Sequence, residues 1–419
     1  MSSGKCQRLS VLMVSLLILG VFTPREAAGQ KDGDPILAGV SMTIRSKVMQ
    51  EERPLQVHLP RGYETSTDRY PVLILLDGRT DFHHVIGITE FLAANYKALP
   101  MIVVGVSNTN RTRDLTPAME SQPAALAHTG VGGAARFLEF IESELLPAID
   151  GKYRSSPYRI LVGRSHGGLF TLHAFITRPD LFDAYIAIDP SLWWDEAALF
   201  SQLVSHLSEQ GGLNRTIFMA DATRDKQLLE SLDTAANAEM WLGFRKKAQL
   251  ASWLSTKAPA DLKWAVREYP DDDHGSVTHR AVYDGLELIF SDMNKSAAEL
   301  FELVRDGGLE AVDAYYAALA RRYGVPSVAP ESVVNTLGYG FLQTDAERAI
   351  TLFAENVKRF PNSPNSHDSL GDAYAANQRL DQALESYRMA VKLANKQRHP
   401  NRALYRQKLD RIQAYLNQP

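Results

Sequence analysis

The chain has 419 residues, of which 45% are hydrophobic and 22% are charged, with 45 basic side chains against 49 acidic ones. This ordinary globular composition excludes a disordered, collagen-like or low-complexity protein, and the length suggests two or three domains of about 150 residues. A formal charge of −4 gives no overall attraction to nucleic acid, and the single cysteine, Cys6, excludes disulfides and thiolate metal sites from the body of the chain.

The first 29 residues have the pattern of an export signal. Lys5 and Arg8 precede an apolar run over residues 9–22, and small residues follow at 27–29. This run is short for a bilayer span, which favours a cleaved signal over an uncleaved membrane anchor. A mature chain without cysteine suits a bacterial periplasmic or secreted protein better than a disulfide-stabilised eukaryotic one. We therefore expect export, with no stable membrane span after residues 1–29 are removed.

Residues 30–295 are predicted to form one α/β domain. Short β-branched runs alternate with amphipathic stretches, and the runs are apolar on both faces, as in strands that are buried on both sides. A helical stripe over residues 134–149 ends near Gly151. A doubly wound, mostly parallel sheet with helices on both faces accommodates this alternation. The expected strands are 71–76, 101–105, 159–162, 184–188, 216–219 and 263–267.

Beyond this domain the strand pattern disappears, and the chain is predicted to be helical to its end. A connector over residues 296–330 precedes a module of tetratricopeptide-like repeats over residues 331–419. Ala349 and Phe353 lie one repeat period, about 34 residues, before their counterparts in a complete repeat. The module either holds a protein partner or serves packing alone. The complete repeat is marked by His367, Leu370, Gly371, Tyr374, Ala383, Tyr387 and Ala390.

The segment Gly163-Arg-Ser-His-Gly167 fits the G-x-S-x-G turn, in which a serine projects above a sheet. A buried strand precedes it directly, and a predicted helix follows over residues 169–176. A plain turn that needs glycine for backbone reasons is the alternative. The strand–turn–helix context favours Ser165 as a nucleophile. The oxyanion donors are then expected to be the backbone N–H of His166 and one from Gly78, after an earlier strand.

A serine nucleophile needs a base at hydrogen-bond distance and an acid that orients the base. His274 follows a strand that ends at Tyr269, and Asp225 follows the strand at 216–219, so serine, acid and histidine come in the chain order of hydrolases. Loops at the carboxyl ends of strands converge on one crevice, where these residues can meet. We expect His274 to be the base and Asp225 the acid. The alternatives for the acid are Asp221, a local carboxylate at Asp272 or Asp273, or no acid at all.

Five ordered motifs resemble those of the putative-esterase family of α/β-hydrolases, which includes esterase D, feruloyl esterases and enterobactin trilactone esterases. The likeness spans about residues 35–292. It implies that Ser165 is the nucleophile and His274 the base, and that Arg111 and Arg113 line or brace the pocket. The motifs are Tyr70–Gly78, Asn110–Pro117, Gly163–Phe170, Asp189–Asp195 and Asp273–Ser276.

These residues predict a serine esterase acting on a small ester, with no metal and no organic cofactor. Trp193 and Trp194 near the expected mouth would suit an aryl or catecholate acyl group, and the two arginines would suit an anionic one. Residues 227–256 exceed a minimal connection and suggest a helical lid carrying Trp241 and Trp253.

Three other functions stay open on the sequence alone. An acyltransferase would use the same residues and pass the acyl group to an alcohol. A binding protein would combine an inert hydrolase fold with a partner held on the helical module. A metallohydrolase would have to gather Asp271, Asp272, Asp273 and His274 on one ion, which adjacent residues rarely do. No nucleic-acid partner is expected.

Overall fold

A computed structural model of the protein describes residues 37–119, 130–209, 211–224, 226, 237–293, 295–324 and 328–417. The described residues fall into two compact units, one over residues 37–340 and the other from residue 341 onward. The predicted signal at 1–29 lies outside the described residues, and so does Asp225.

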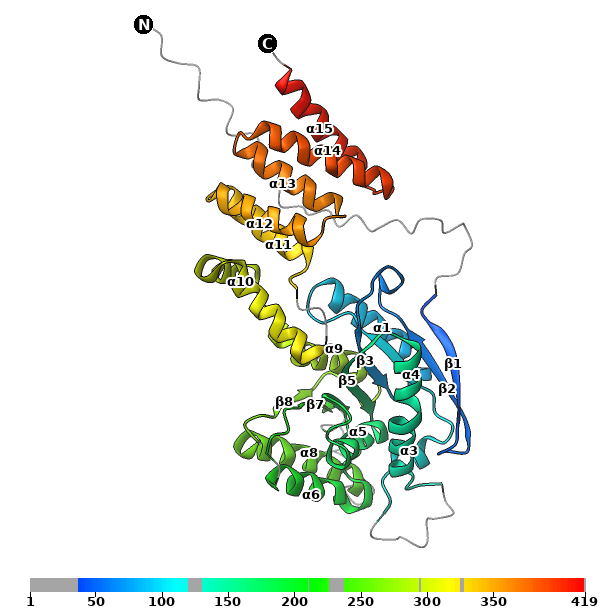
Figure 1. Ribbon diagram of the computed structural model, residues 1–419. Helices are drawn as coiled ribbons and strands as arrows, with labels where there is room; N and C mark the ends of the chain where they lie inside the picture. The colour runs from blue at the N-terminus through cyan, green and yellow to red at the C-terminus, as the bar shows by residue number, and fades with distance from the viewer. Residues whose placement is uncertain are drawn as a thin grey trace. The chain divides into compact units, whose positions relative to one another are not determined.

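An eight-stranded sheet forms the centre of the larger unit (Figure 1). The strand order is β1-β2-β4-β3-β5-β6-β7-β8, in which β2 is antiparallel to both of its neighbours and every later pair is parallel. This arrangement confirms the predicted mostly parallel α/β fold. The strands are β1 (Val40–Ser46), β2 (Glu51–His58), β3 (Tyr70–Leu75), β4 (Ile102–Val106), β5 (Ser155–Arg164), β6 (Ala184–Ile188), β7 (Thr216–Ala222) and β8 (Lys263–Tyr269).

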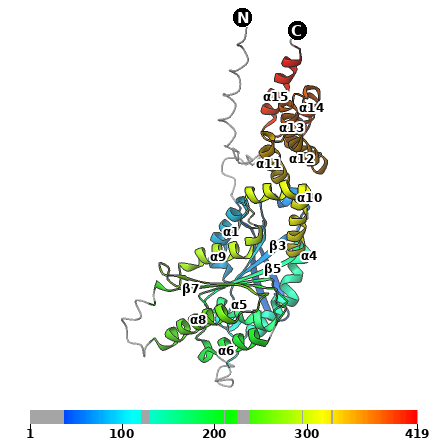
Figure 2. The same cartoon turned by 90° about the vertical axis from the view of Figure 1, so that its left-hand side faces the viewer.

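Helices cover both faces of this sheet, as Figure 2 shows. Successive strand residues point to opposite faces, so Ile74 joins one buried cluster while Leu73 and Leu75 join the other. One face carries α3 (Ala134–Phe140), a π-helical turn (Ile141–Leu145), α4 (Leu146–Lys152), α5 (His166–Thr177), α6 (Trp194–Glu209) and α8 (Ala238–Lys257). The other carries α1 (Gly78–Ala94), α9 (Val277–Ile289) and residues of α10 (Ala297–Tyr323). Short helices are Tyr63–Thr65, α2 (Arg111–Leu115) and Ser291–Met293.

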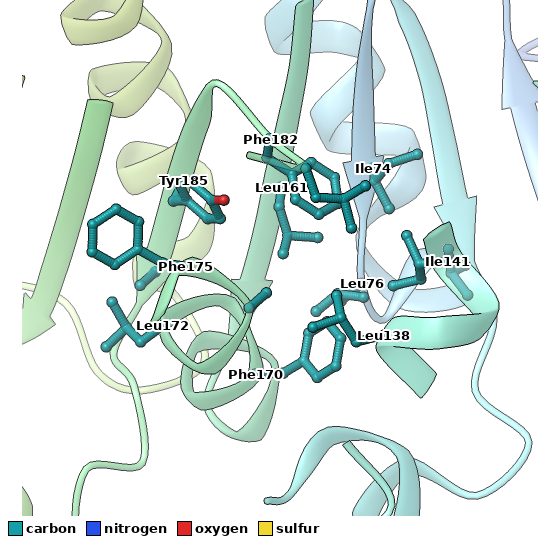
Figure 3. Close-up of a cluster of buried hydrophobic side chains, with 14 of the residues drawn as sticks. Ile74, Leu76, Leu138, Ile141, Leu161, Phe170, Leu172, Phe175, Phe182 and Tyr185 are labelled. Carbon is teal, nitrogen blue, oxygen red and sulfur yellow. The ribbon is translucent and has the colours of Figure 1, made fainter. Parts of the chain in front are cut away.

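The side chains under α5 hold that helix firmly against the sheet (Figure 3). Phe170 and Phe175 of α5 are fully buried in one cluster with Leu161 of β5 and Tyr185 of β6. Full burial of one such side chain contributes about 1.5–3 kcal/mol. Because α5 begins at the residue after Ser165, this packing also anchors the turn that carries the serine.

Helices alone make up the regular structure described beyond residue 340, which confirms the predicted helical C-terminal region. At the pair Gly371 and Tyr387 the helices approach so closely that a Cβ on the glycine would lie 2.6 Å from the tyrosine ring. The Tyr387 hydroxyl donates a hydrogen bond of 2.7 Å to Asp372. The repeat family itself stays a prediction. The helices are α12 (Ala346–Arg359), α13 (Pro364–Ala376), α14 (Leu380–Lys396) and α15 (Arg402–Leu416), while α11 (Glu331–Leu342) crosses the division.

In the parts of the chain that are described, no helix is both long enough and apolar enough to cross a membrane. The apolar run at residues 9–22 lies outside those parts.

Candidate active site

Three adjacent strands lead into residues with left-handed backbone at the same edge of the sheet. These residues are Asp77 after β3 (φ 57°), Ser165 after β5 (φ 62°) and Asp189 after β6 (φ 41°). Because β3, β5 and β6 are neighbours and parallel, their carboxyl ends converge on one crevice. A non-glycine residue in such a conformation stores strain of about 1–3 kcal/mol, and strain of this kind clusters at active sites.

The serine turn has the strand, the sharp bend and the helix that its motif predicts. Ser165 lies between the last residue of β5 and the first of α5, with φ 62° and ψ −120°. Its N–H donates a hydrogen bond of 2.9 Å to the carbonyl of Ile188 in β6. A Cβ on Gly163 would lie 2.4 Å from the carbonyl oxygen of Gly167, so the turn closes only with glycine at position 163.

His274 lies in the loop after β8, where its Nδ1 contacts a buried carboxylate. Nδ1 is 2.5 Å from Oδ2 of Asp189, whose side chain is 9% exposed, whereas the His274 side chain is 47% exposed. Nδ1 donates to this carboxylate, which leaves Nε2 as the nitrogen that can accept a proton. A further bond of 3.3 Å joins the Arg164 side chain to the carbonyl of His274, tying the histidine loop to the strand that carries the serine.

Ser165, Asp189 and His274 all line one cavity of about 680 Å³. In this structure Ser165 Oγ lies 3.4 Å from Oγ of Ser191. Catalytic hydrogen bonds are often long before substrate arrives, so this contact of Ser165 with Ser191 does not rule out a pair of Ser165 and His274. The other lining residues are Pro190, Ser191, Trp193, Ala222, Asn237, Ala238, Glu239, Met240, Gly243, Phe244 and Lys247.

Asp189 has a second partner on helix α8. The buried ammonium of Lys247 contacts Oδ1 of Asp189 and also Oδ1 of Asp221. Burial opposes ionisation of Asp189, but the hydrogen bond from His274 and the charge of Lys247 outweigh it and hold the pKa of Asp189 below its ordinary value. Burial dominates at Asp221 and raises its pKa to about 6, although Lys247 is in contact with it. Asp189 is therefore the more readily ionised carboxylate of the two.

The acid candidates that were named from the sequence and that the structure describes pair with other groups. Asp225 lies outside the described residues, and Asp221 contacts Lys247. Asp272 pairs with Arg280, and Asp273 pairs with Arg224. The carboxylate that contacts His274 is Asp189, which sequence analysis quoted in a motif without giving it a role. Its position directly after a buried strand, next to the strand that leads into the serine, is the signal that could have identified it.

The residues of the acidic run at 271–274 do not face one another. Asp272 accepts from Arg280 and from the Ser276 hydroxyl, while Asp273 accepts from backbone N–H groups of the same turn and His274 contacts Asp189. These separate partners leave the side chains without the convergence that a shared metal ion would require.

The expected oxyanion donors lie at the ends of two helices that begin near the serine. The first hydrogen bond of α5 runs from the N–H of Leu169 to the carbonyl of Ser165. The N–H of His166 therefore has no acceptor within the helix. Gly78 opens α1, and a Cβ there would lie 2.5 Å from the backbone of Gly105 in β4. Packing between strand and helix thus requires glycine at position 78, whatever its N–H binds.

The two tryptophans expected at the mouth have different surroundings. Trp193 lines the cavity, whereas the indole N–H of Trp194 donates a hydrogen bond of 3.1 Å to the carbonyl of Pro117. The His166 ring lies 5.9 Å from the Trp193 ring and 5.6 Å from that of Trp194. Burial, followed by the charge of Arg111, lowers the pKa of His166, so this ring is neutral near pH 7.

Arg111 and Arg113 both pair with carboxylates in this structure. Arg111 forms a two-pronged pair with Asp77 at 2.7 and 2.9 Å, and it also donates to the carbonyl of Arg164 at 3.0 Å. Arg113 pairs with Glu51 and Asp114, both at 2.7 Å. Within the described part of the chain, the residues lining the cavity do not include either arginine.

The expected lid over residues 227–256 is described only from residue 237 onward. Helix α8 supplies Met240, Gly243, Phe244 and Lys247 to the cavity wall, and residues 227–236 lie outside the described residues. Gly243 faces Trp193 so closely that a Cβ on it would lie 3.1 Å from the indole. This helix therefore forms one wall of the cavity.

Comparisons with known proteins agree on one family. The family model described as Putative esterase matches residues 46–257, just over half of the chain. The siderophore triacetylfusarinine C esterase of Aspergillus fumigatus is 34% identical over 166 residues, which are 35% of this chain and 54% of that protein. The siderophore enterobactin esterase of Emericella nidulans is 30% identical over 210 residues, 45% of this chain and 68% of that protein. The chain thus spans about half to two thirds of these relatives.

A solved structure matches over a longer stretch. The IroE-like serine hydrolase from Shewanella oneidensis has a TM-score of 0.62 and 31% sequence identity, covering 77% of this chain and 99% of that chain.

Proposed function

From the premise that this chain belongs to the Putative esterase family of α/β-hydrolases, we propose that it hydrolyses a small carboxylic ester through an acyl-enzyme on Ser165. The proposal rests on one observation above all. The strained serine and the histidine that contacts Asp189 line the same cavity.

The proposed first half-reaction acylates the serine. Ser165 Oγ attacks the ester carbonyl while Nε2 of His274 takes the hydroxyl proton, and Asp189 stabilises the resulting imidazolium. The negative oxygen of the tetrahedral intermediate accepts hydrogen bonds from the N–H of His166 and from the Gly78 turn. The carbon–oxygen bond to the alcohol then breaks, and His274 returns the proton to the departing alkoxide.

Water completes the proposed cycle. His274 removes a proton from water, whose oxygen attacks the acyl carbon, and the second tetrahedral intermediate expels Ser165, which is reprotonated by His274. The net reaction converts an ester and water into an acid and an alcohol. These steps use only side chains and backbone N–H groups of this chain.

We place the substrate among aryl or siderophore-type esters. The cavity wall combines Trp193, Met240 and Phe244, which suit the flat apolar face of an aryl or catecholate acyl group. The curated relatives reported above are named as siderophore esterases. A matched panel of siderophore, feruloyl and short-chain esters tests this assignment, and highest kcat/KM on short alkyl esters would contradict it.

The decisive variant is Ser165→Ala. We expect hydrolysis of p-nitrophenyl acetate or butyrate by the full-length protein to fall by at least about a thousandfold, because the variant lacks the nucleophile. Labelling by a fluorophosphonate probe should disappear in Ser165→Ala and be blocked in His274→Ala.

Ser205→Ala serves as the matched control. The hydroxyl of this exposed serine on α6 donates to Glu209 at 2.6 Å, and the serine is not among the cavity-lining residues described, so its removal should leave both turnover and labelling unchanged. Wild-type turnover in Ser165→Ala would reject the serine mechanism and return the chain to the binding-protein alternative.

A further inference from the structure

A buried cation lies next to Asp189, and the proposed reaction does not itself use it. This cation is the ammonium of Lys247, a residue of α8 that is 4% exposed. Its ammonium touches one oxygen of Asp189 and one of Asp221, while the other Asp189 oxygen contacts His274. The four side chains therefore form a continuous chain of charged contacts, from α8 through the ends of β6 and β7 to the loop after β8.

We propose that Lys247 is a positioning residue for catalysis, which holds Asp189 ionised and aimed at His274 through their shared contacts. The inference rests on the proposed function of Ser165 and His274. It adds Lys247 as the residue that keeps their acid, Asp189, ionised and in place.

The buried carboxylate of Asp189 needs a cation beside it. Its backbone is left-handed (φ 41°), its N–H is held by the carbonyl of Ala220 at 2.8 Å, and its carboxylate is almost entirely shielded from water. A buried carboxylate is expensive unless it is paired and hydrogen-bonded. His274 contacts one oxygen of this carboxylate, and the ammonium of Lys247 contacts the other, so Lys247 provides the buried positive charge that offsets the cost of burial.

The surroundings of Lys247 combine one aromatic ring with several titratable groups. The ring of Phe244, one turn earlier on the same helix, lies 4.5 Å from its ammonium. The titratable groups facing the cluster are Asp189 from the end of β6, Asp221 from β7, Glu268 from β8 and His274 from the following loop. Burial disfavours the charged lysine, yet the two aspartates outweigh it and raise the pKa of Lys247.

The two aspartates are unequal partners, and this inequality selects the acid. Asp189 has both Lys247 and His274, whereas Asp221 has Lys247 and the repulsion of Asp189 and Glu268. When one of the two carboxylates takes up a proton, Asp221 is the one that does so. Lys247 contacts both carboxylates, and the hydrogen bond to His274 is what distinguishes Asp189 from Asp221.

The main test compares Lys247→Met with Lys246→Met. Loss of the ammonium should lower kcat on p-nitrophenyl butyrate about 10- to 100-fold with KM nearly unchanged, because the acid is displaced while the cavity keeps its shape. The acid limb of the kcat/KM profile should move to higher pH by about one unit, since removing a positive charge makes protonation of the site easier. Lys246, the preceding residue on α8, has its ammonium 4.5 Å from the Phe200 ring and should give wild-type kinetics when changed to methionine.

A second comparison remains informative if the single variant does not fold. Lys247→Met leaves Asp221 without a cation, so the change is repeated in an Asp221→Asn background, where that charge is absent. The double variant should still be at least about tenfold slower than Asp221→Asn alone. A double variant as fast as Asp221→Asn would overturn the inference.

Other outcomes separate the competing explanations. A raised KM with unchanged kcat in Lys247→Met would mean that the lysine binds substrate, which overturns the positioning role. A larger loss in Asp221→Asn than in Lys247→Met would identify Asp221 as the acid, with the same consequence. If instead Ser165→Ala retains full turnover, the proposed function fails first. Loss of activity in Ser165→Ala together with wild-type behaviour of Lys247→Met rejects this inference alone.

Discussion

Ser165 and Asp189 lie at the ends of adjacent parallel strands, but the chain holds them in different ways. The serine is held by its own neighbours in sequence, through a strand, two close glycines and the helix that begins at the next residue. The aspartate is held by Lys247 and His274, which are 58 and 85 positions away. The position of Ser165 thus depends on local backbone geometry, whereas that of Asp189 depends on long-range electrostatic contacts.

The strongest test of this contrast removes the charge of the acid. Asp189→Asn should lower kcat by about 10³–10⁴-fold at little change in KM, because the amide no longer stabilises the imidazolium of His274. The measurement is steady-state hydrolysis of p-nitrophenyl butyrate at the pH of maximum rate.

Asp225→Asn is the competing variant and should stay within about threefold of wild type. A large loss in Asp225→Asn with a small loss in Asp189→Asn would restore the acid expected from the sequence.

The local side of the contrast is tested at Gly163. In Gly163→Ala the new Cβ would lie 2.4 Å from the Gly167 carbonyl oxygen, so the turn must move and the serine with it. A displacement of about 1 Å costs about 100-fold in rate, measurable both as kcat and as the rate of fluorophosphonate labelling.

Gly87→Ala in α1 is the matched control for this change. Its added methyl meets nothing within 4 Å, and the variant should keep full activity while gaining about 0.5–1 kcal/mol of stability. Normal labelling of Gly163→Ala would show that the turn tolerates a side chain.

The smallest expected effect concerns stability, and it tests how firmly α5 supports the serine. Burial lowers the pKa of His173 on α5 to about 4, and neither of its ring nitrogens has a protein hydrogen-bond partner in the described structure. Between about pH 6.5 and 4 the unfolded chain binds this proton and the folded chain does not, so the free energy of unfolding falls as the pH decreases through that range. This one histidine should contribute about 2 kcal/mol to the decrease.

Denaturant unfolding at pH 7 and at pH 4.5 measures that contribution. His173→Leu should flatten the pH dependence, while His83→Leu, on the exposed side of α1, should leave it as in the wild type. Equal slopes in all three proteins would mean that His173 is not the responsible group.

The same contrast explains which parts of the molecule could be predicted from sequence. The strands β3 to β8 were predicted because nearly all of them are buried on both faces and form continuous apolar runs. The hairpin of β1 and β2 was missed because it lies at the edge of the sheet, where exposed and buried residues alternate and Pro54 interrupts the apolar pattern.

Ser165 was found because its motif specifies its own backbone, and His274 was proposed because of the order of candidates along the chain. The contact between His274 and Asp189 could not be predicted from a motif or from the order of residues along the chain. It depends on a lysine on a later helix and on the burial of two competing aspartates, neither of which leaves a periodic trace in the sequence.

The left-handed residues at positions 77, 165 and 189 also bear on attempts to engineer this protein. Glycine adopts such a backbone without penalty, so glycine at position 165 should relieve strain and raise the melting temperature while removing the proposed nucleophile. At positions 77 and 189 glycine would also remove the carboxylates that pair with Arg111 and with the buried Lys247, which offsets the relief of strain. Thermal robustness and turnover are therefore opposed at position 165, and a variant library screened for melting temperature should be counter-screened for ester cleavage.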